Sequence, residues 1–220
     1  MKRILFSSAK GGVGKTTVTV NTAKKLKEKG YKVGILDADI VAPNVPLELG
    51  FKEDDRPRME YTEKLIPVEV DGLKVVSYWF ELDSDVPVLL QGNSRVEAIL
   101  SAFCNDVDWG DCDIILVDCP PTTADELTYL ISALPHIEGS FIIVQGNTKL
   151  SVHDAKMSKA AFEFLNVRIF GLIQNMVSEY FDDGIDVEKE LGLKVIAKIP
   201  LGEKEKVDEV VSFLEKEVLI

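Results

Sequence analysis

The chain has 220 residues, of which 46% are hydrophobic, and we expect one folded domain over residues 1–220 rather than a disordered chain. A formal net charge of −12 disfavours non-specific binding to nucleic acid or to an anionic membrane. Three cysteines without a Cys-x-x-Cys pair, and no apolar run as long as a membrane span or signal peptide, predict a cytoplasmic protein with reduced thiols.

Short apolar runs alternate with segments of helical periodicity along the chain. The predicted strands are Arg3–Ser7, Lys32–Asp37, Leu73–Ser77, Asp113–Asp118, Ser140–Gln145, Val167–Gln174 and Lys194–Ile199. The predicted helices are Thr16–Lys29, Ser94–Cys104, Ala124–Ala133, Leu150–Leu165 and Lys204–Glu217. Several strands are nearly continuous in Ile, Leu and Val, which is typical of parallel strands buried on both faces. The alternation predicts an α/β fold with a doubly wound, mostly parallel sheet and helices on both faces.

Residues 50–71 have a different character, because they are charged, contain two prolines and show no clear period. We interpret them as an irregular excursion with a short hairpin-like piece, not as a second domain. The last predicted helix carries an apolar face, but its polar face is rich in Glu and Asp rather than Lys and Arg. Packing against the core is therefore a better interpretation of that face than membrane binding.

A glycine-rich loop joins the first predicted strand to the first predicted helix. It reads Lys10-Gly11-Gly12-Val13-Gly14-Lys15-Thr16-Thr17. Glycines allow the backbone to turn tightly, so that several N–H groups point at one anion beside the positive end of the helix dipole. Lys15 can reach the terminal phosphates of a nucleotide, and the Thr16 hydroxyl can hold Mg²⁺. The pattern predicts a phosphate-binding P-loop.

Acidic residues end two other predicted strands. Asp37 and Asp39 lie two residues apart at the end of the second strand, so their side chains point the same way. Asp118 ends the apolar strand that starts at residue 113, as in a Walker B motif. An Asp-x-Asp pair alone is more often a turn or a helix cap. Beside a P-loop, we expect these carboxylates to support Mg²⁺ and to orient the attacking water. Residues 119–125 follow and are predicted to form a nucleotide-sensing switch.

The loop differs from the standard P-loop in having Ala9 in place of a glycine and a second lysine, Lys10. This form resembles the deviant Walker A motif of MinD, ParA, the nitrogenase iron protein and the Mrp ATPases. The resemblance to Mrp proteins extends over nearly the whole chain. It includes Leu36–Pro46, Asp106–Gly110, Asp118–Asp125, Gly171–Met176 and Ile199–Leu201.

The resemblance implies a Mg²⁺-dependent ATPase that hydrolyses ATP slowly, forms a nucleotide-switched homodimer and serves an unidentified client protein, in metallocofactor assembly. It implies that Lys10 reaches the partner's phosphates. The catalytic residues implied are Lys10, Lys15 and Asp39, and the metal-supporting residues are Thr16, Asp37 and Asp118. The nucleotide contacts implied are Lys10, Gly11, Gly12, Val13, Gly14, Lys15, Thr16, Thr17, Asn175, Pro200 and Leu201, of which Asn175 holds the adenine and the last two line its other side.

One departure from the resembled family concerns metal. Members that carry iron–sulfur clusters have a Cys-x-x-Cys shortly after Asn-Met, but here residues 177–184 contain no cysteine. Cys104, Cys112 and Cys119 are scattered and lack metal-ligand spacing, so a bound iron–sulfur cluster is not expected. Two alternatives stay open. A MinD- or ParA-like spatial switch would need a basic membrane helix or a DNA-binding patch. A ligase or amidotransferase would need an additional substrate pocket.

Overall fold

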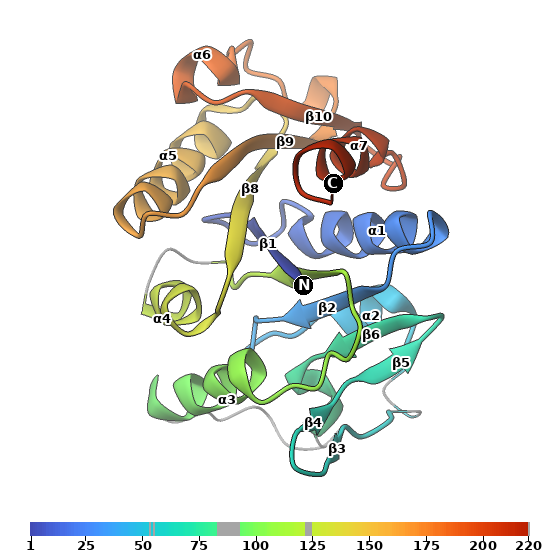
Figure 1. Cartoon of the computed structure of the whole chain (residues 1–220). Coiled ribbons are helices and arrows are strands. Elements are labelled where there is room, and N and C mark those ends of the chain that lie inside the picture. Colours follow the sequence, from blue (N-terminus) through green and yellow to red (C-terminus); the bar gives the residue numbers. More distant parts are fainter. Residues whose placement is uncertain (53, 55, 83–92, 122–124, 220) are drawn as a thin grey trace.

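The computed structural model describes residues 1–52, 54, 56–82, 93–121 and 125–219. Among these residues, eight strands form one sheet in the order β10-β9-β8-β1-β7-β2-β6-β5 (Figure 1). The strands are β1 (Lys2–Ser7), β2 (Val33–Asp37), β5 (Val68–Val70), β6 (Leu73–Val76), β7 (Ile114–Asp118), β8 (Ile137–Gln145), β9 (Ile169–Val177) and β10 (Val195–Pro200). Neighbouring strands are parallel except β5 and β6, which are antiparallel. The predicted fold class is confirmed.

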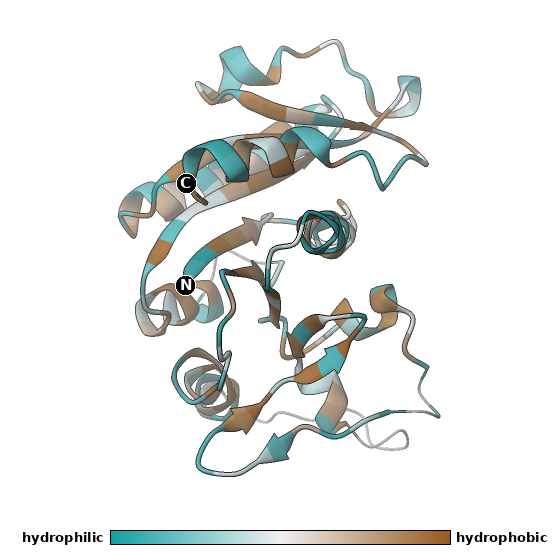
Figure 2. Ribbon diagram, turned by 45° about the vertical axis from the view of Figure 1, so that its right-hand side comes forward, coloured by the Kyte–Doolittle hydropathy of each residue, from teal (hydrophilic) through white to brown (hydrophobic). Residues whose placement is uncertain are grey.

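Helices cover both faces of the sheet (Figure 1). One face carries α1 (Lys15–Glu28), α2 (Val45–Leu49) and α7 (Asp208–Glu217), and the other carries α3 (Asn93–Asn105), α4 (Asp125–Ala133) and α5 (Lys149–Phe164). The short helix α6 (Val187–Leu191) packs against α5. Figure 2 shows hydrophobic residues concentrated on the strands between these two layers. The sheet is therefore buried on both faces, as its apolar strands require.

The C-terminal helix α7 belongs to the hydrophobic core. Its residues Val210, Val211 and Leu214 have no exposed surface. The ring of Phe213, also on α7, lies 5.5 Å from that of Phe141 on β8. The prediction that the apolar face of this helix packs against the core is confirmed.

The structure differs from the sequence-based prediction at several boundaries. Helix α7 begins at Asp208 and not at Lys204, because residues 203–207 form tight turns in which Lys206 N–H donates to the Glu203 carbonyl. Residues 50–71 contain the small hairpin of β3 (Glu60–Tyr61) and β4 (Leu65–Ile66), but also β5, which extends the main sheet and was not predicted. The short helices α2 and α6, together with the 3-10 turns at Tyr78–Glu81 and Glu179–Phe181, were also missed. Residues 122–124 of the predicted switch lie outside the described residues.

Candidate nucleotide-binding site

The P-loop runs from the end of β1 to Gly14, which caps helix α1. Gly12 and Gly14 have φ angles of 81° and 82°, in the left-handed region that favours glycine. A Cβ atom at Gly14 would clash with the side-chain amide of Asn175. That amide donates a hydrogen bond of 2.8 Å to the carbonyl of Val13. Both the backbone turn and the close approach of β9 therefore require glycine at position 14.

Lys15 and Asp118 form a buried ion pair at the start of α1. The Lys15 Nζ lies 2.9 Å from the Asp118 Oδ1, and the two side chains are only 7% and 1% exposed. The Thr16 hydroxyl donates to the Asp118 Oδ2 at 2.6 Å, and the Thr19 hydroxyl lies 3.1 Å from the Asp118 Oδ1. Parallel pairing of β1 with β7 places Phe6 opposite Asp118. The sheet therefore brings the predicted P-loop lysine, its threonine and the Walker B aspartate together.

Asp37 is fully buried beside this ion pair, at the end of β2 and opposite Asp118 on β7. Its Oδ2 accepts hydrogen bonds from the Ser77 hydroxyl at 2.8 Å and from the Val45 N–H at 3.2 Å. Burial, and then the neighbouring Asp118, raise the pKa of Asp37 to about 8. Asp39 lies half-buried two residues on, and burial raises the pKa of its carboxyl as well.

The site has more acidic than basic groups, so its charge favours binding of a cation. Burial lowers the pKa of Lys15, but Asp118 and further acidic neighbours outweigh that effect and hold it above its ordinary value of 10.5. One ammonium group thus lies beside two buried carboxyl groups, Asp37 and Asp118, and a bound cation would favour the ionised form of Asp37. Together with the Thr16 hydroxyl they form a set of hard oxygen donors, which fits Mg²⁺. Within the described part of the chain, no three His, Cys, Asp or Glu side chains gather at a metal-binding distance. Mg²⁺ needs only one or two carboxylates, because water and phosphate complete its shell.

Two neighbouring pockets share Thr17 and contain the other predicted contacts. The first, of about 540 Å³, is lined by residues 10–17 together with Ser8, Asp39, Ala42, Asn44, Leu47, Glu48 and Pro121. The second, of about 290 Å³, is lined by Thr17, Asn175, Met176, Pro200, Leu201, Gly202, Lys204 and Glu205. The loop that was predicted to bind phosphate and the residues that were predicted to hold a base therefore line adjoining spaces.

Thr19 and Ser77 belong to the site but were not predicted from the sequence. Both are fully buried, and their hydroxyls contact Asp118 and Asp37 respectively. A signal for each was available. Thr19 lies three residues after Thr16, on the same face of the helix. Ser77 follows β6, which is the parallel neighbour of β2, so both strands end at the same edge of the sheet.

The three cysteines are free and buried; Cys104 lies on α3, and Cys112 and Cys119 lie just before and just after β7. Burial raises the pKa of Cys104 and of Cys119 to about 12, so both thiols keep their protons at neutral pH. In the segment after Asn175, carboxylates bind backbone groups instead. Asp182 accepts from the Gly184 N–H at 2.7 Å, and Asp183 accepts from the first N–H of α5 at 2.8 Å.

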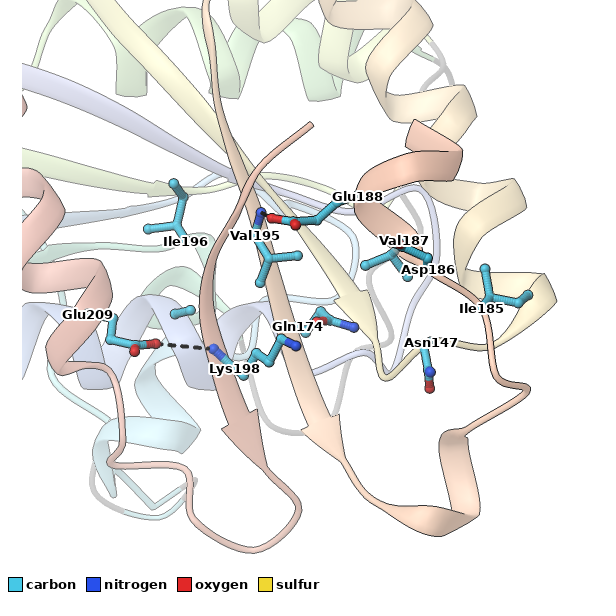
Figure 3. A pocket seen from close by; sticks show the side chains of 11 residues that line it. Asn147, Gln174, Ile185, Asp186, Val187, Glu188, Val195, Ile196, Lys198 and Glu209 are labelled. Carbon is cyan, nitrogen blue, oxygen red and sulfur yellow. Dashed lines mark hydrogen bonds between the residues drawn. The ribbon is translucent and has the colours of Figure 1, made fainter. Parts of the chain in front are cut away.

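A further pocket, of about 570 Å³, lies along β10, which ends the row of strands in the sheet (Figure 3). There the Glu188 carboxylate accepts from the Val195 N–H at 2.6 Å, and the Glu209 carboxylate accepts from the Lys198 N–H at 3.4 Å. Side-chain carboxylates that occupy edge N–H groups protect a sheet against pairing with another chain. We interpret this pocket as part of that edge protection, since none of the predicted site residues lines it.

A family model described as "ParA: NUBPL iron-transfer P-loop NTPase" matches residues 1–215. The chain belongs to this P-loop NTPase family. The chain is 39% identical over 213 residues to an iron–sulfur cluster carrier protein of Methanocaldococcus jannaschii, covering 90% of this chain and 72% of the relative. It is 36% identical over 219 residues to an iron–sulfur cluster carrier protein of Methanococcus maripaludis, covering 93% and 74%.

Solved structures of the same fold include a nucleotide-binding protein of Archaeoglobus fulgidus in complex with ADP. That protein is 26% identical to this chain, with a TM-score of 0.73 over 98% of this chain and 88% of the other. The MinD cell division protein of Aquifex aeolicus is 25% identical, with a TM-score of 0.64 over 96% and 86%. The predicted resemblance to the deviant Walker A family is confirmed.

The names of the two carrier relatives do not support the sequence-based expectation that this chain binds no iron–sulfur cluster. This chain has no Cys-x-x-Cys pair, and the word carrier in the relatives' names describes those proteins and not this one. Among the described residues, none of the helices combines the length and the apolarity that crossing a membrane requires.

Proposed function

We propose that this protein binds ATP with Mg²⁺, hydrolyses it slowly and switches between monomer and homodimer with its nucleotide state. The buried Lys15–Asp118 ion pair, with the Thr16 hydroxyl on the same carboxylate, is the observation that carries this proposal. Phosphate oxygens in the P-loop pocket would compete with Asp118 for the Lys15 ammonium. The backbone N–H groups of residues 11–17 would bind the remaining phosphate oxygens.

The other residues of the site have separate roles in this proposal. Thr16, Asp37 and Asp118 would hold Mg²⁺, which neutralises phosphate charge when it is bound. Asp39 lines the P-loop pocket and would orient the attacking water. The base would occupy the adjoining pocket, against Asn175, Pro200 and Leu201.

Dimerisation over the nucleotide is supported by the surface beside the P-loop pocket. Val41 is 53% exposed, and Leu47, which lines the pocket, is 43% exposed. Lys10 lines the same pocket, and the described residues offer its side chain no ion-pair partner. We propose that a second copy covers these apolar residues and that Lys10 contacts the partner's phosphates, where a positive charge stabilises the developing phosphate oxygens.

Two variants test the switch. Asp39→Ala should keep ATP binding and lose hydrolysis, and should therefore accumulate an ATP-bound dimer. Lys10→Ala should lose both the dimer and turnover. Light scattering during gel filtration with MgATP measures the mass, and phosphate release measures turnover. Lys216→Ala removes an exposed lysine from α7 and should match the wild type. If Asp39→Ala stays monomeric with ATP, the switch proposal fails.

The iron–sulfur cluster enters this proposal as cargo. The family description and the carrier names of the relatives support a role in metallocofactor assembly. Cys104, Cys112 and Cys119 are buried and have no Cys-x-x-Cys spacing, so we propose that a client protein supplies the cluster ligands and that this chain supplies the ATP switch.

Anaerobic reconstitution with iron and sulfide tests the origin of the ligands. The protein alone should give no stoichiometric charge-transfer absorption band, because its three cysteines are buried and none belongs to a Cys-x-x-Cys pair. A stoichiometric band that disappears in Cys119→Ser would show that the chain itself holds the cluster and would overturn this part of the proposal.

A further inference from the structure

A separate pocket of about 310 Å³ lies at the edge of the sheet opposite to the P-loop, where β1, β7 and β8 begin. Arg3 of β1, Trp109 before β7 and Pro135 before β8 line it. Lys64, in the turn between β3 and β4, forms another wall. That turn is held in place by backbone hydrogen bonds of 2.8 and 2.9 Å between Leu65 and residues 106 and 108.

Arg3 is a buried cation in this pocket. Its side chain is only 7% exposed, and one guanidinium nitrogen donates to the Pro135 carbonyl at 2.9 Å. No carboxylate in the described part of the chain pairs with it. Burial lowers the pKa of the guanidinium, and the ionisable group that opposes this effect is the thiol of Cys104. A guanidinium has five N–H donors in a fixed fork, so most of its donor capacity remains available.

A buried arginine without a carboxylate partner among the described residues is unexpected in a protein as acidic as this one. The net charge is −12, and the neighbouring Lys2 forms an ion pair of 3.3 Å with Glu138. A buried charge without a partner costs free energy that an opposite charge would offset. The exposed Lys64 adds a second cation at the rim and has no ion pair among the described residues. Asp108 is the acidic residue of the lining, and its carboxylate accepts from the Gly110 N–H at 3.0 Å.

We propose that this pocket binds the oxyanion group of a small metabolite, a phosphate or a carboxylate. The guanidinium of Arg3 would bind the anion, and Lys64 would add a second positive charge. The fork of the guanidinium matches two oxygens of either group. The volume corresponds to roughly ten water molecules, so an organic body fits beside the anionic group. Val107 and Trp109 supply apolar walls for that body. The site is independent of the P-loop, which lies at the other ends of the strands.

Titration calorimetry with inorganic phosphate tests the site, with succinate as the carboxylate probe in a parallel series. We expect a dissociation constant on the order of 1 mM or lower for at least one probe. Arg3→Gln should weaken binding by about tenfold or more, because a charge-assisted hydrogen bond is lost. Lys2→Gln removes the same charge one residue away, where it faces Glu138, and should leave binding unchanged.

Two milder variants keep the test decisive if Arg3→Gln does not fold. Lys64→Gln should weaken binding by about threefold, and Asp108→Asn should tighten it, because repulsion is removed while the amide oxygen still accepts from Gly110. Binding that is lost in Lys15→Ala but kept in Arg3→Gln would place the anion in the P-loop and overturn the proposal. Equal affinity of the wild type, Lys64→Gln and Asp108→Asn would also overturn it. Failure of ATP binding would leave these comparisons intact.

Discussion

Two threonine hydroxyls on helix α1 have opposite surroundings, although both residues are fully buried. The Thr19 hydroxyl lies 3.1 Å from the Asp118 carboxylate, whereas the Thr22 hydroxyl has no hydrogen-bond partner among the described residues. Thr19→Val should therefore lower the free energy of unfolding by about 1–2 kcal/mol, since a bond to a charged group is lost. Thr22→Val should be neutral or stabilising, because it removes a buried polar atom without a partner. Urea unfolding of both variants measures the difference. Equal destabilisation by the two substitutions would contradict the assigned contact.

At the scale of elements, the junction between the P-loop and α1 depends more on Gly14 than on Gly11. Gly14→Ala should destabilise the fold by about 1–3 kcal/mol, because it combines a left-handed φ with a clash against Asn175 of β9. Gly11→Ala is the matched control in the same loop, since a Cβ there meets nothing within 4 Å and should cost little stability. Urea unfolding in the absence of nucleotide separates the two. Comparable losses would show that β9 does not constrain the loop.

The elements that the sequence predicted well are those with strong local signals. The buried strand of β7 and the glycine loop before α1 were located to within about a residue, because apolar continuity and glycine spacing are local properties. Helices α2 and α6 have five residues each, too few to show a period. Strand β5 depends on antiparallel pairing with β6. The hydrogen bonds of Thr19 and Ser77 to the two aspartates are tertiary contacts, so their positions in the sequence mark them only as candidates.

At the scale of the whole molecule, the described strands other than β3 and β4 form one sheet, and the family model spans residues 1–215. That residues 1–220 form one domain stays a prediction. Parallel order places Asp37 and Asp118 beside the P-loop at one edge, and the Arg3 pocket at the opposite edge. The likeness to MinD concerns fold, and the acidic net charge disfavours the membrane or DNA surface that a spatial switch would need. Cytoplasmic location stays a prediction.

Calorimetric titration of ATP, with and without Mg²⁺, tests the central claim of nucleotide binding most directly. The wild type should bind ATP, with higher affinity when Mg²⁺ is present, because we propose that Thr16, Asp37 and Asp118, which lie together, hold the ion. Lys15→Ala should weaken binding by more than about tenfold, or about 1.4 kcal/mol, since the point charge for the terminal phosphates is lost. Lys216→Ala should bind as the wild type does. Equal affinity of the wild type and Lys15→Ala would contradict the account.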